Sequence, residues 1–269
     1  MTLPEKPIRW FSETLQLTGV AHTGPESFGN TDFIGKRVGL INGSSWIVPC
    51  ANYFGRLFIP GAHLINIGNE ALQVNFMEAF EHGQPTPPKS NIDAFIGYAR
   101  DLAELGHVDA ILITCSTMNR SFPTVVEAMS PYGIPVIQID RPMMERAVKR
   151  GGKCLVIATH GPTVASTQSL LHETSTELQI PLEFVGETVE DAWLHLAKGE
   201  VEEHNHLLAR TIKKHQEIEP IDSVVLAQLS MTIFLLSYPD PQKSFGIPVF
   251  TSGQCGFERV AEVLTKRSH

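Results

Sequence analysis

The sequence of 269 residues predicts an α/β fold of two pseudo-symmetric lobes, each with a parallel sheet, and an active site in the cleft between them. Short β-branched runs alternate with longer amphipathic stretches through most of the chain, which is typical of α/β proteins. The runs are apolar at consecutive positions, as expected for parallel strands that helices cover on both faces. The second half of the chain also repeats the pattern of the first.

Eight apolar runs are predicted as strands. They are residues 37–42, 62–67, 109–114 and 134–139, followed by 153–158, 181–185, 222–227 and 247–251. Segments 119–130 and 142–150 have helical character and lie next to the third and fourth runs. The Gly- and Pro-rich stretch 82–91 is interpreted as a loop that could form a lid. Residues 1–35 show little periodicity and are interpreted as an N-terminal extension.

A constant offset relates the two series of strands. Residues 133–136 (GIPV) return as residues 246–249, which is 113 positions later. Residues 109–118 (DAILITCSTM) return at the same offset as residues 222–231 (DSVVLAQLSM). An offset that holds over two strands indicates an internal duplication.

The helix after the second of these strands follows the same rule. The pair Glu145–Arg146 falls on Glu258–Arg259 at the offset of 113 residues. We therefore expect a first α/β lobe at residues 36–150 and a second at residues 151–269.

Composition limits the class of function. The net charge is −8 and the pI is about 5.8, so the surface repels phosphate backbones and nucleic-acid binding is not expected. The longest apolar stretch, residues 224–238, is too short to cross a bilayer. The start MTLPEKPIRW carries charges where a secretory signal has an apolar core. We expect a cytoplasmic protein that does not bind membranes.

The four cysteines, Cys50, Cys115, Cys154 and Cys255, lie far apart, without the spacing of disulfide frameworks or metal sites. No glycine-rich nucleotide motif follows a strand. The sequence therefore predicts free thiols, no metal site and no nucleotide cofactor.

The predicted strands end in small hydroxyl and amide side chains. Ligands of parallel α/β sheets bind beyond the carboxyl ends of the strands, and the following helices offer N-terminal N–H groups to an anion. We expect these side chains to bind a substrate carboxylate, and the alternative is that some of the hydroxyls only cap helices. The candidate residues are Asn42, Ser44, Ser116, Thr117, Thr159, Thr163 and Ser230.

Cys115 lies at a strand-to-helix turn, where a helix N-terminus lowers the pKa of a thiol. The alternative is a small buried apolar residue, which describes most free cysteines. His160 directly follows another strand and is a candidate proton carrier. Cys255 follows the last strand and could face the same cleft, whereas Cys154 lies within a strand and is expected in the core.

Three motifs carry a resemblance to a known family. LITCSTMN (112–119), LINGSS (40–45) and VIATHGPTV (156–164) each end a predicted strand. In that order they resemble the first catalytic-cysteine segment, the first-strand loop and the second-lobe threonine loop of the aspartate/glutamate (hydantoin) racemase superfamily. The resemblance covers about residues 36–265.

The resemblance implies two Rossmann-like lobes that bind a small carboxylate or amino-acid-like substrate between them without a cofactor. It also implies that the last helix of the chain packs back on the first lobe. In this family two cysteines on opposite faces of the substrate remove and return the proton next to the carboxyl group.

The sequence departs from the family pattern at the second cysteine. That cysteine belongs in VVLAQLSM, where Gln228 stands, and the 113-residue offset independently carries Cys115 onto Gln228. A glutamine amide does not exchange a proton near neutral pH, but it can donate a hydrogen bond to an enolate-like oxygen. One thiol is enough for a reaction on one face of the carbon.

We expect a cofactor-independent enzyme in which Cys115 transfers a proton at the α-carbon of a small carboxylate, as a lyase, decarboxylase or isomerase, with Gln228 assisting. One alternative is an amino-acid or hydantoin-type racemase whose second base is His160 or Cys255. Another is a non-catalytic protein that binds a small acid. A homo-oligomer, dimer or higher, is also expected.

Overall fold

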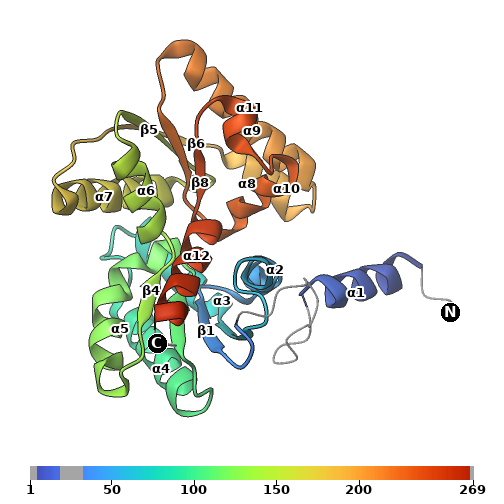
Figure 1. Cartoon of the computed structure of the whole chain (residues 1–269), viewed down its shortest axis with the longest axis vertical. Helices are drawn as coiled ribbons and strands as arrows, with labels where there is room; N and C mark the ends of the chain where they lie inside the picture. The colour runs from blue at the N-terminus through green and yellow to red at the C-terminus, as the bar shows by residue number, and fades with distance from the viewer. Residues whose placement is uncertain (1–4, 19–32, 267–269) are drawn as a thin grey trace. The chain divides into compact units, whose positions relative to one another are not determined.

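The computed structural model describes residues 5–18 and 33–266. The chain divides into two compact units, each with a four-stranded sheet and surrounding helices (Figure 1). Unit 1 comprises residues 1–114, 120–137 and 257–269. Unit 2 comprises residues 115–119 and 138–256. The chain therefore passes from one unit to the other four times.

The sheet of unit 1 has the strand order β2–β1–β3–β4. The central strand β1 pairs in parallel with both β2 and β3. The strands are β1 (Arg37–Asn42), β2 (His63–Gly68), β3 (Ala110–Ile113) and β4 (Val136–Gln138). The α-helices along this part of the chain are α2 (Val48–Phe58), α3 (Glu70–Glu81), α4 (Lys89–Glu104) and α5 (Phe122–Met129). Short 3-10 helices are η1 (Ser45–Ile47), η2 (Ser116–Ser121) and η3 (Ser130–Tyr132).

The sheet of unit 2 has the equivalent order β6–β5–β7–β8, and its strands pair in parallel. The strands are β5 (Lys153–Ala158), β6 (Glu183–Thr188), β7 (Ser223–Leu226) and β8 (Val249–Thr251). The helices along this part of the chain are α6 (Arg141–Arg150), α7 (Gly161–Leu178), α8 (Glu190–Ala197), α9 (Val201–Ile218), η4 (Leu229–Ile233), α10 (Phe234–Ser237), α11 (Pro241–Phe245) and α12 (Ser252–Lys266). The predicted fold class is confirmed.

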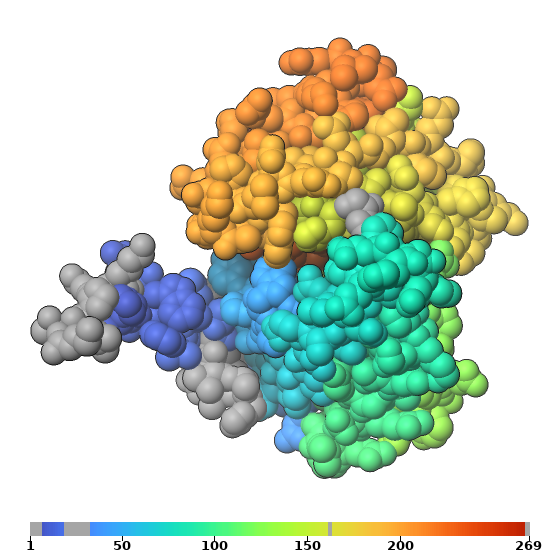
Figure 2. Space-filling view, turned by 180° about the vertical axis from the view of Figure 1, so that it is seen from behind, coloured from blue at the N-terminus to red at the C-terminus, as the bar shows by residue number. Residues whose placement is uncertain are grey.

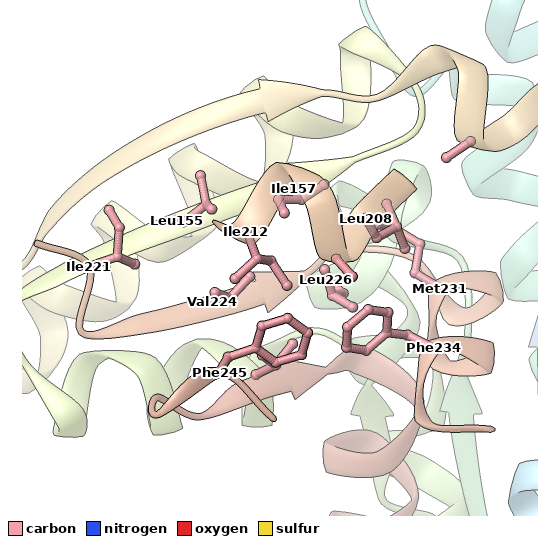
Figure 3. Packing of buried hydrophobic residues seen from close by; sticks show 13 residues of the cluster. Leu155, Ile157, Leu208, Ile212, Ile221, Val224, Leu226, Met231, Phe234 and Phe245 are labelled. Carbon is pink, nitrogen blue, oxygen red and sulfur yellow. The ribbon is translucent and has the colours of Figure 1, made fainter. Parts of the chain in front are cut away.

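Helices cover both faces of the unit 2 sheet. Leu155 and Ile157 of β5 join a buried cluster with Leu208 of α9, and Figure 3 shows how these side chains pack. The alternate residues Cys154 and Val156 join a second cluster with the apolar side chains of α6 and α7. Both faces of the strand are thus withdrawn from water, which explains why β5 is apolar at consecutive positions.

The 113-residue offset holds in the structure. It carries β3 onto β7 and β4 onto β8, residue for residue. An aspartate just before the first strand of each pair makes equivalent hydrogen bonds. Asp109 Oδ2 accepts from the N–H of Arg37 at 2.8 Å, and Asp222 Oδ2 accepts from the N–H of Lys153 at 2.7 Å. The two halves thus share topology and local contacts.

Some predicted boundaries differ from the structure. The loop predicted at 82–91 is shorter, because α4 begins at Lys89, and its role as a lid stays a prediction. The predicted boundary between the lobes lies after residue 150, whereas in the structure residues 138–150 already belong to unit 2. The reason is that α6 packs against α7, β7 and β8. Residues 257–269 group with unit 1, where Phe257 lies against Gly55 of α2.

Residues Glu5–Thr18 form α1, which is dark blue in Figure 2. No helix was predicted here, although Ile8, Phe11 and Leu15 have helical spacing. Arg56 of α2 donates to the carbonyl oxygens of Gln16 and Leu17 at 3.4 and 2.7 Å, which ties the end of α1 to α2. Residues 1–4 and 19–32 of the predicted extension lie outside the described residues.

Candidate active site

The thiol of Cys115 lies at the carboxyl end of β3. Cys115 is partly buried, and its Sγ lies 3.1 Å from Thr117 Oγ1. The chain turns here into η2, and the Met118 N–H donates to the Cys115 carbonyl oxygen at 3.1 Å. Residues 115–119 group with unit 2, although β3 belongs to unit 1.

The pKa of the Cys115 thiol is raised above its ordinary value. Burial is the largest cause, and the Asp140 carboxylate acts in the same direction. The Thr117 hydroxyl and the N–H groups of Thr117 and Met118 lower the pKa, as expected for a turn into a helix. The predicted net lowering is wrong, because desolvation of the thiolate outweighs these donors. Cys115 is therefore a thiol at neutral pH.

Gln228 occupies the equivalent position after β7. The Met231 N–H donates to its carbonyl oxygen at 2.9 Å, as Met118 does to Cys115. Its side-chain Oε1 accepts from the N–H of Thr159 at 2.7 Å and from Thr159 Oγ1 at 2.9 Å. A backbone N–H can only donate, so the atom that faces it must be the amide oxygen. The amide is therefore fixed through its oxygen, and its NH₂ group remains a donor.

Asp140 is a buried carboxylate at the N-cap of α6, with no exposed surface. Asn119 Nδ2 donates to its Oδ2 at 2.9 Å, while its Oδ1 has no hydrogen-bond partner among the described residues. Burial raises the pKa of Asp140 to about 6, and the Asn119 amide and nearby Ser116 hydroxyl partly oppose this. Although the Ser116 hydroxyl is close enough to lower that pKa, it does not meet hydrogen-bond geometry. A carboxyl with this pKa changes charge just below neutral pH.

His160 is the N-cap residue of α7 and lies against Trp193 of α8, with ring centroids 4.9 Å apart. Burial lowers the pKa of the imidazole, and the Glu190 carboxylate partly opposes this. His160 is therefore neutral at pH 7 and able to accept a proton.

The predicted carboxylate-binding hydroxyls of unit 2 fall into two groups. Thr159 and Thr117 are already engaged, with Gln228 and Cys115 respectively. Ser116, Thr163 and Ser230 are buried, and the hydroxyls of Ser116 and Thr163 have no hydrogen-bond partner among the described residues. Buried polar atoms are normally paired, so these hydroxyls retain hydrogen-bonding capacity for a ligand or water. Their role in carboxylate binding stays a prediction.

In unit 1 the Asn42 side chain is fully buried and engaged with neighbouring strands. Its Nδ2 donates to Asn66 Oδ1 at 3.0 Å and to the Ile67 carbonyl oxygen at 3.3 Å, while its Oδ1 accepts from Thr114 Oγ1 at 2.6 Å. These bonds tie together the ends of β1, β2 and β3. They give Asn42 a clear structural role, and its predicted contact with substrate remains untested.

Ser44 is the N-cap residue of η1 and is buried, but its hydroxyl makes no cap hydrogen bond. The loop that holds it approaches the end of β2 so closely that a Cβ at Gly68 would lie 2.9 Å from the Ser44 carbonyl oxygen. Ser45 fixes the same loop to Glu70, because its N–H and hydroxyl donate to the carboxylate at 2.8 and 2.6 Å. The position of Ser44 is thus set by its neighbours.

The remaining cysteines differ from Cys115. Cys154 and Cys255 are buried in the core that includes α6 and α7, and burial raises the pKa of Cys50 and of Cys154 to about 12. Within residues 5–18 and 33–266, no three His, Cys, Asp or Glu side chains are grouped closely enough to hold a metal ion. No helix in that part of the chain is long and apolar enough to cross a membrane.

The sequence interpretation did not select Asp140 or assign a role to Asn119. The rule that selected the other candidates could have found Asp140, because this residue follows the predicted strand 134–139. The repeat gives a second signal, since the offset of 113 places Gly253 where the first half has Asp140. The two halves therefore differ here, because one has an acidic residue after its last strand and the other has glycine at the equivalent position.

Solved structures share this fold. Glutamate racemase from Francisella tularensis subsp. tularensis SCHU S4, in complex with D-glutamate, matches with a TM-score of 0.60 and 16% identity, covering 87% of this chain and 82% of that chain. Allantoin racemase from Klebsiella pneumoniae matches with a TM-score of 0.59 and 17% identity, covering 87% and 89%. An aspartate racemase homologue from Pyrococcus horikoshii OT3 matches with a TM-score of 0.58 and 20% identity, covering 87% and 100%.

Similarity at these identities concerns the fold. A sequence comparison with curated proteins found no match. The family model described as Asp/Glu/Hydantoin racemase matches residues 70–260, which is more than half of the chain. The chain therefore belongs to the Asp/Glu/hydantoin racemase family.

Proposed function

We propose that the protein is a cofactor-independent enzyme that transfers a proton on one face of the α-carbon of a small carboxylate, with Cys115 as the proton-transferring group. The observation that carries this proposal is the pairing of Cys115 and Gln228 at equivalent strand ends. One position holds a group that transfers protons and the other holds a group that does not. A lyase, a decarboxylase and a one-face isomerase all need only one such group.

Gln228 acts in this proposal as a hydrogen-bond donor to the enolate oxygen. Its Oε1 is held by two hydrogen bonds from Thr159, so the NH₂ group has a defined direction before substrate arrives. A donor that is fixed in advance stabilises developing negative charge without reorganisation during the reaction. The buried hydroxyls of Ser116, Thr163 and Ser230 would bind the substrate carboxylate.

A second candidate is a true racemase in which His160 supplies the second base. It is favoured by one observation, the lowered pKa that leaves His160 neutral and able to accept a proton. Cys255 has less support in this role, because it is 1% exposed and packs in the core of unit 2.

Proton exchange in deuterium oxide separates these candidates. The probes would be both enantiomers of aspartate and glutamate, a hydantoin, maleate and a 2-substituted malonate, followed by NMR and chiral chromatography. We expect one compound to be consumed, or labelled at the α-carbon with retention of configuration. Label together with inversion would instead support the racemase, and His160→Gln should then abolish the inversion.

The matched variants are Cys115→Ser and Gln228→Cys. Cys115→Ser should abolish label and product, whereas Gln228→Cys restores a thiol to both halves and should add some exchange with inversion. If a probe binds to the wild type and to Gln228→Cys but gives neither label nor product at any pH, the proposed enzymatic activity is contradicted. The protein would then be a small-acid binding protein.

A further inference from the structure

Helix α1 presents a large exposed apolar surface. Its five large apolar side chains are between 48% and 59% exposed, and they are Ile8, Trp10, Phe11, Leu15 and Leu17. Exposed apolar surface that is gathered on one element marks an interaction site in a soluble protein. The family model begins at residue 70, so α1 lies outside the part of the chain that the family model covers.

The apolar side chains form one face of the helix. At 3.6 residues per turn, a line through Thr14 and Thr18 runs along the middle of this face. Apolar side chains lie on both sides of the line, with Ile8, Phe11 and Leu15 on one side and Trp10 and Leu17 on the other. Among residues 7–18 only the two threonines are partly buried, and the other residues are exposed. The chain therefore covers the middle of the face and leaves both flanks in water.

The hydrogen bonds that hold α1 to α2 lie at the C-terminal end of α1. Arg56 donates to the carbonyl oxygens of Gln16 and Leu17. These bonds use backbone acceptors, so they hold the helix without covering its apolar side chains. The exposed fraction decreases toward this end, from 59% at Ile8 to 48% at Leu17. The apolar face therefore remains available to a partner.

The spacing of the apolar side chains fits a second helix. Ile8, Phe11 and Leu15 follow one another at intervals of three and four residues, which is the spacing of the seam between two packed helices. A strand or an extended peptide would present its side chains at a period of two. The spacing thus favours a helix as the partner element.

The charge of α1 argues against a membrane surface as the partner. Basic and acidic residues balance in this helix, and they are Lys6, Arg9, Glu5 and Glu13. Arg9 Nε donates to Glu13 Oε1 at 2.7 Å, which pairs two of these charges within the helix. Helices that bind anionic membranes are rich in Lys and Arg on their polar face, and the whole chain has a net charge of −8. Two copies of a helix without net charge approach each other without electrostatic repulsion.

We propose that α1 packs against α1 of a second copy of this chain in a symmetric dimer, with Ile8, Phe11 and Leu15 at the centre of the contact. In such a dimer the same surface serves both copies, so no complementary surface is needed elsewhere. Half-exposed side chains of this size present on the order of 500 Å² per copy. Two copies would bury about 1,000 Å², the lower limit for a specific interface, so the dimer should dissociate on dilution. This inference goes beyond the proposed function and does not depend on it.

Sedimentation velocity of the full-length protein tests the interface at concentrations of about 1–200 µM. The wild type should show a dimer fraction that rises with concentration. The combined variant Phe11→Gln and Leu15→Gln should have half the mass of the wild type at the highest concentration. Glutamine keeps the helix propensity at these positions and removes the apolar contact.

Glu13→Gln is the matched control. It places a glutamine on the charged side of the same helix, so the mass should stay at the wild-type value. Circular dichroism and thermal melting would verify folding. Ile8→Gln is a second variant in case the combined variant does not fold, and it should weaken association at least about tenfold, because each copy loses one buried apolar side chain.

Three results would overturn the inference. The first is a wild type that stays monomeric at every concentration. The second is a dimer whose mass the combined variant and Ile8→Gln both leave unchanged. The third is binding of the wild type to phosphatidylglycerol vesicles that the combined variant abolishes, because α1 would then serve a membrane surface and not a second copy.

Discussion

The two halves of this chain share a backbone plan but not a chemistry. The strand orders are equivalent, and β3 and β4 map onto β7 and β8 at one offset. Cys115 and Gln228 each accept a hydrogen bond from the N–H three residues later. Yet a thiol with a nearby carboxylate stands in one half, and an amide held by Thr159 stands in the other. The shared backbone fixes where a functional side chain lies, and the side chain alone decides what it can do.

The largest expected effect comes from the thiol. Cys115→Ser replaces the thiol by a hydroxyl, which is a much weaker acid, and turnover of the true substrate should fall by about 10²–10⁴. Steady-state kinetics would measure this, with thermal melting to verify folding. Near-normal activity of this variant would contradict the assignment of proton transfer to Cys115, and His160 would become the leading candidate for that role.

Substitutions at Gln228 and its partner Thr159 should lower turnover by less than Cys115→Ser does. Gln228→Ala removes the proposed donor to the enolate oxygen, and kcat should fall by about 10–10³. Thr159→Val removes one of the two bonds that hold the amide but keeps the backbone N–H at 2.7 Å, so its loss should be clearly smaller than that of Gln228→Ala. Equal losses in both variants would show that Thr159 acts on substrate directly.

Asp140 should cost stability in a pH-dependent way. Its folded-state pKa of about 6 exceeds the ordinary value of 3.8, so the folded state binds the proton more tightly. Stability is therefore lost as pH rises from about 4 to 6, and the penalty is complete above pH 7. Asp140→Asn should raise the free energy of unfolding at pH 8 by about 1–3 kcal/mol, and the gain should shrink at pH 5. Denaturant titrations at both pH values would measure it, and a less stable variant at pH 8 would contradict it.

The smallest expected effect concerns the aspartates that the halves share. Asp109→Ala and Asp222→Ala each remove the acceptor of a strand-start N–H, and each should lower the free energy of unfolding by about 1 kcal/mol. Asp222 should cost more, because its bond is partly buried while that of Asp109 is exposed. Chemical denaturation of the two variants side by side would test this, and a larger loss in Asp109→Ala would contradict it.

The sequence predicted the strands that recur in both halves and the side chains that follow the strand ends. The strands are buried on both faces, so they appear in the sequence as continuous apolar runs. The offset of 113 residues predicted that β3 and β7 are equivalent and that Gln228 stands where the first half has Cys115. The pKa of Cys115 was not predictable, because it depends on burial and on the charge of groups distant in sequence, such as Asp140. The hydrogen bond from Thr114 Oγ1 to Asn42 Oδ1 forms because β1 and β3 are neighbours in the sheet. The order of strands in a sheet cannot be derived from the residues of any one strand.

The assignment of the last helices has a consequence for the history of the chain. Residues 138–150 end the first half but belong to unit 2, and residues 257–269 end the second half but belong to unit 1. Reciprocal exchange of a terminal element is how a domain-swapped homodimer is built. A gene fusion of two such copies would preserve the exchange within a single polypeptide. In a homodimer one mutation alters both copies at once, whereas after fusion positions 115 and 228 can change separately, and one thiol can become an amide while the other is kept.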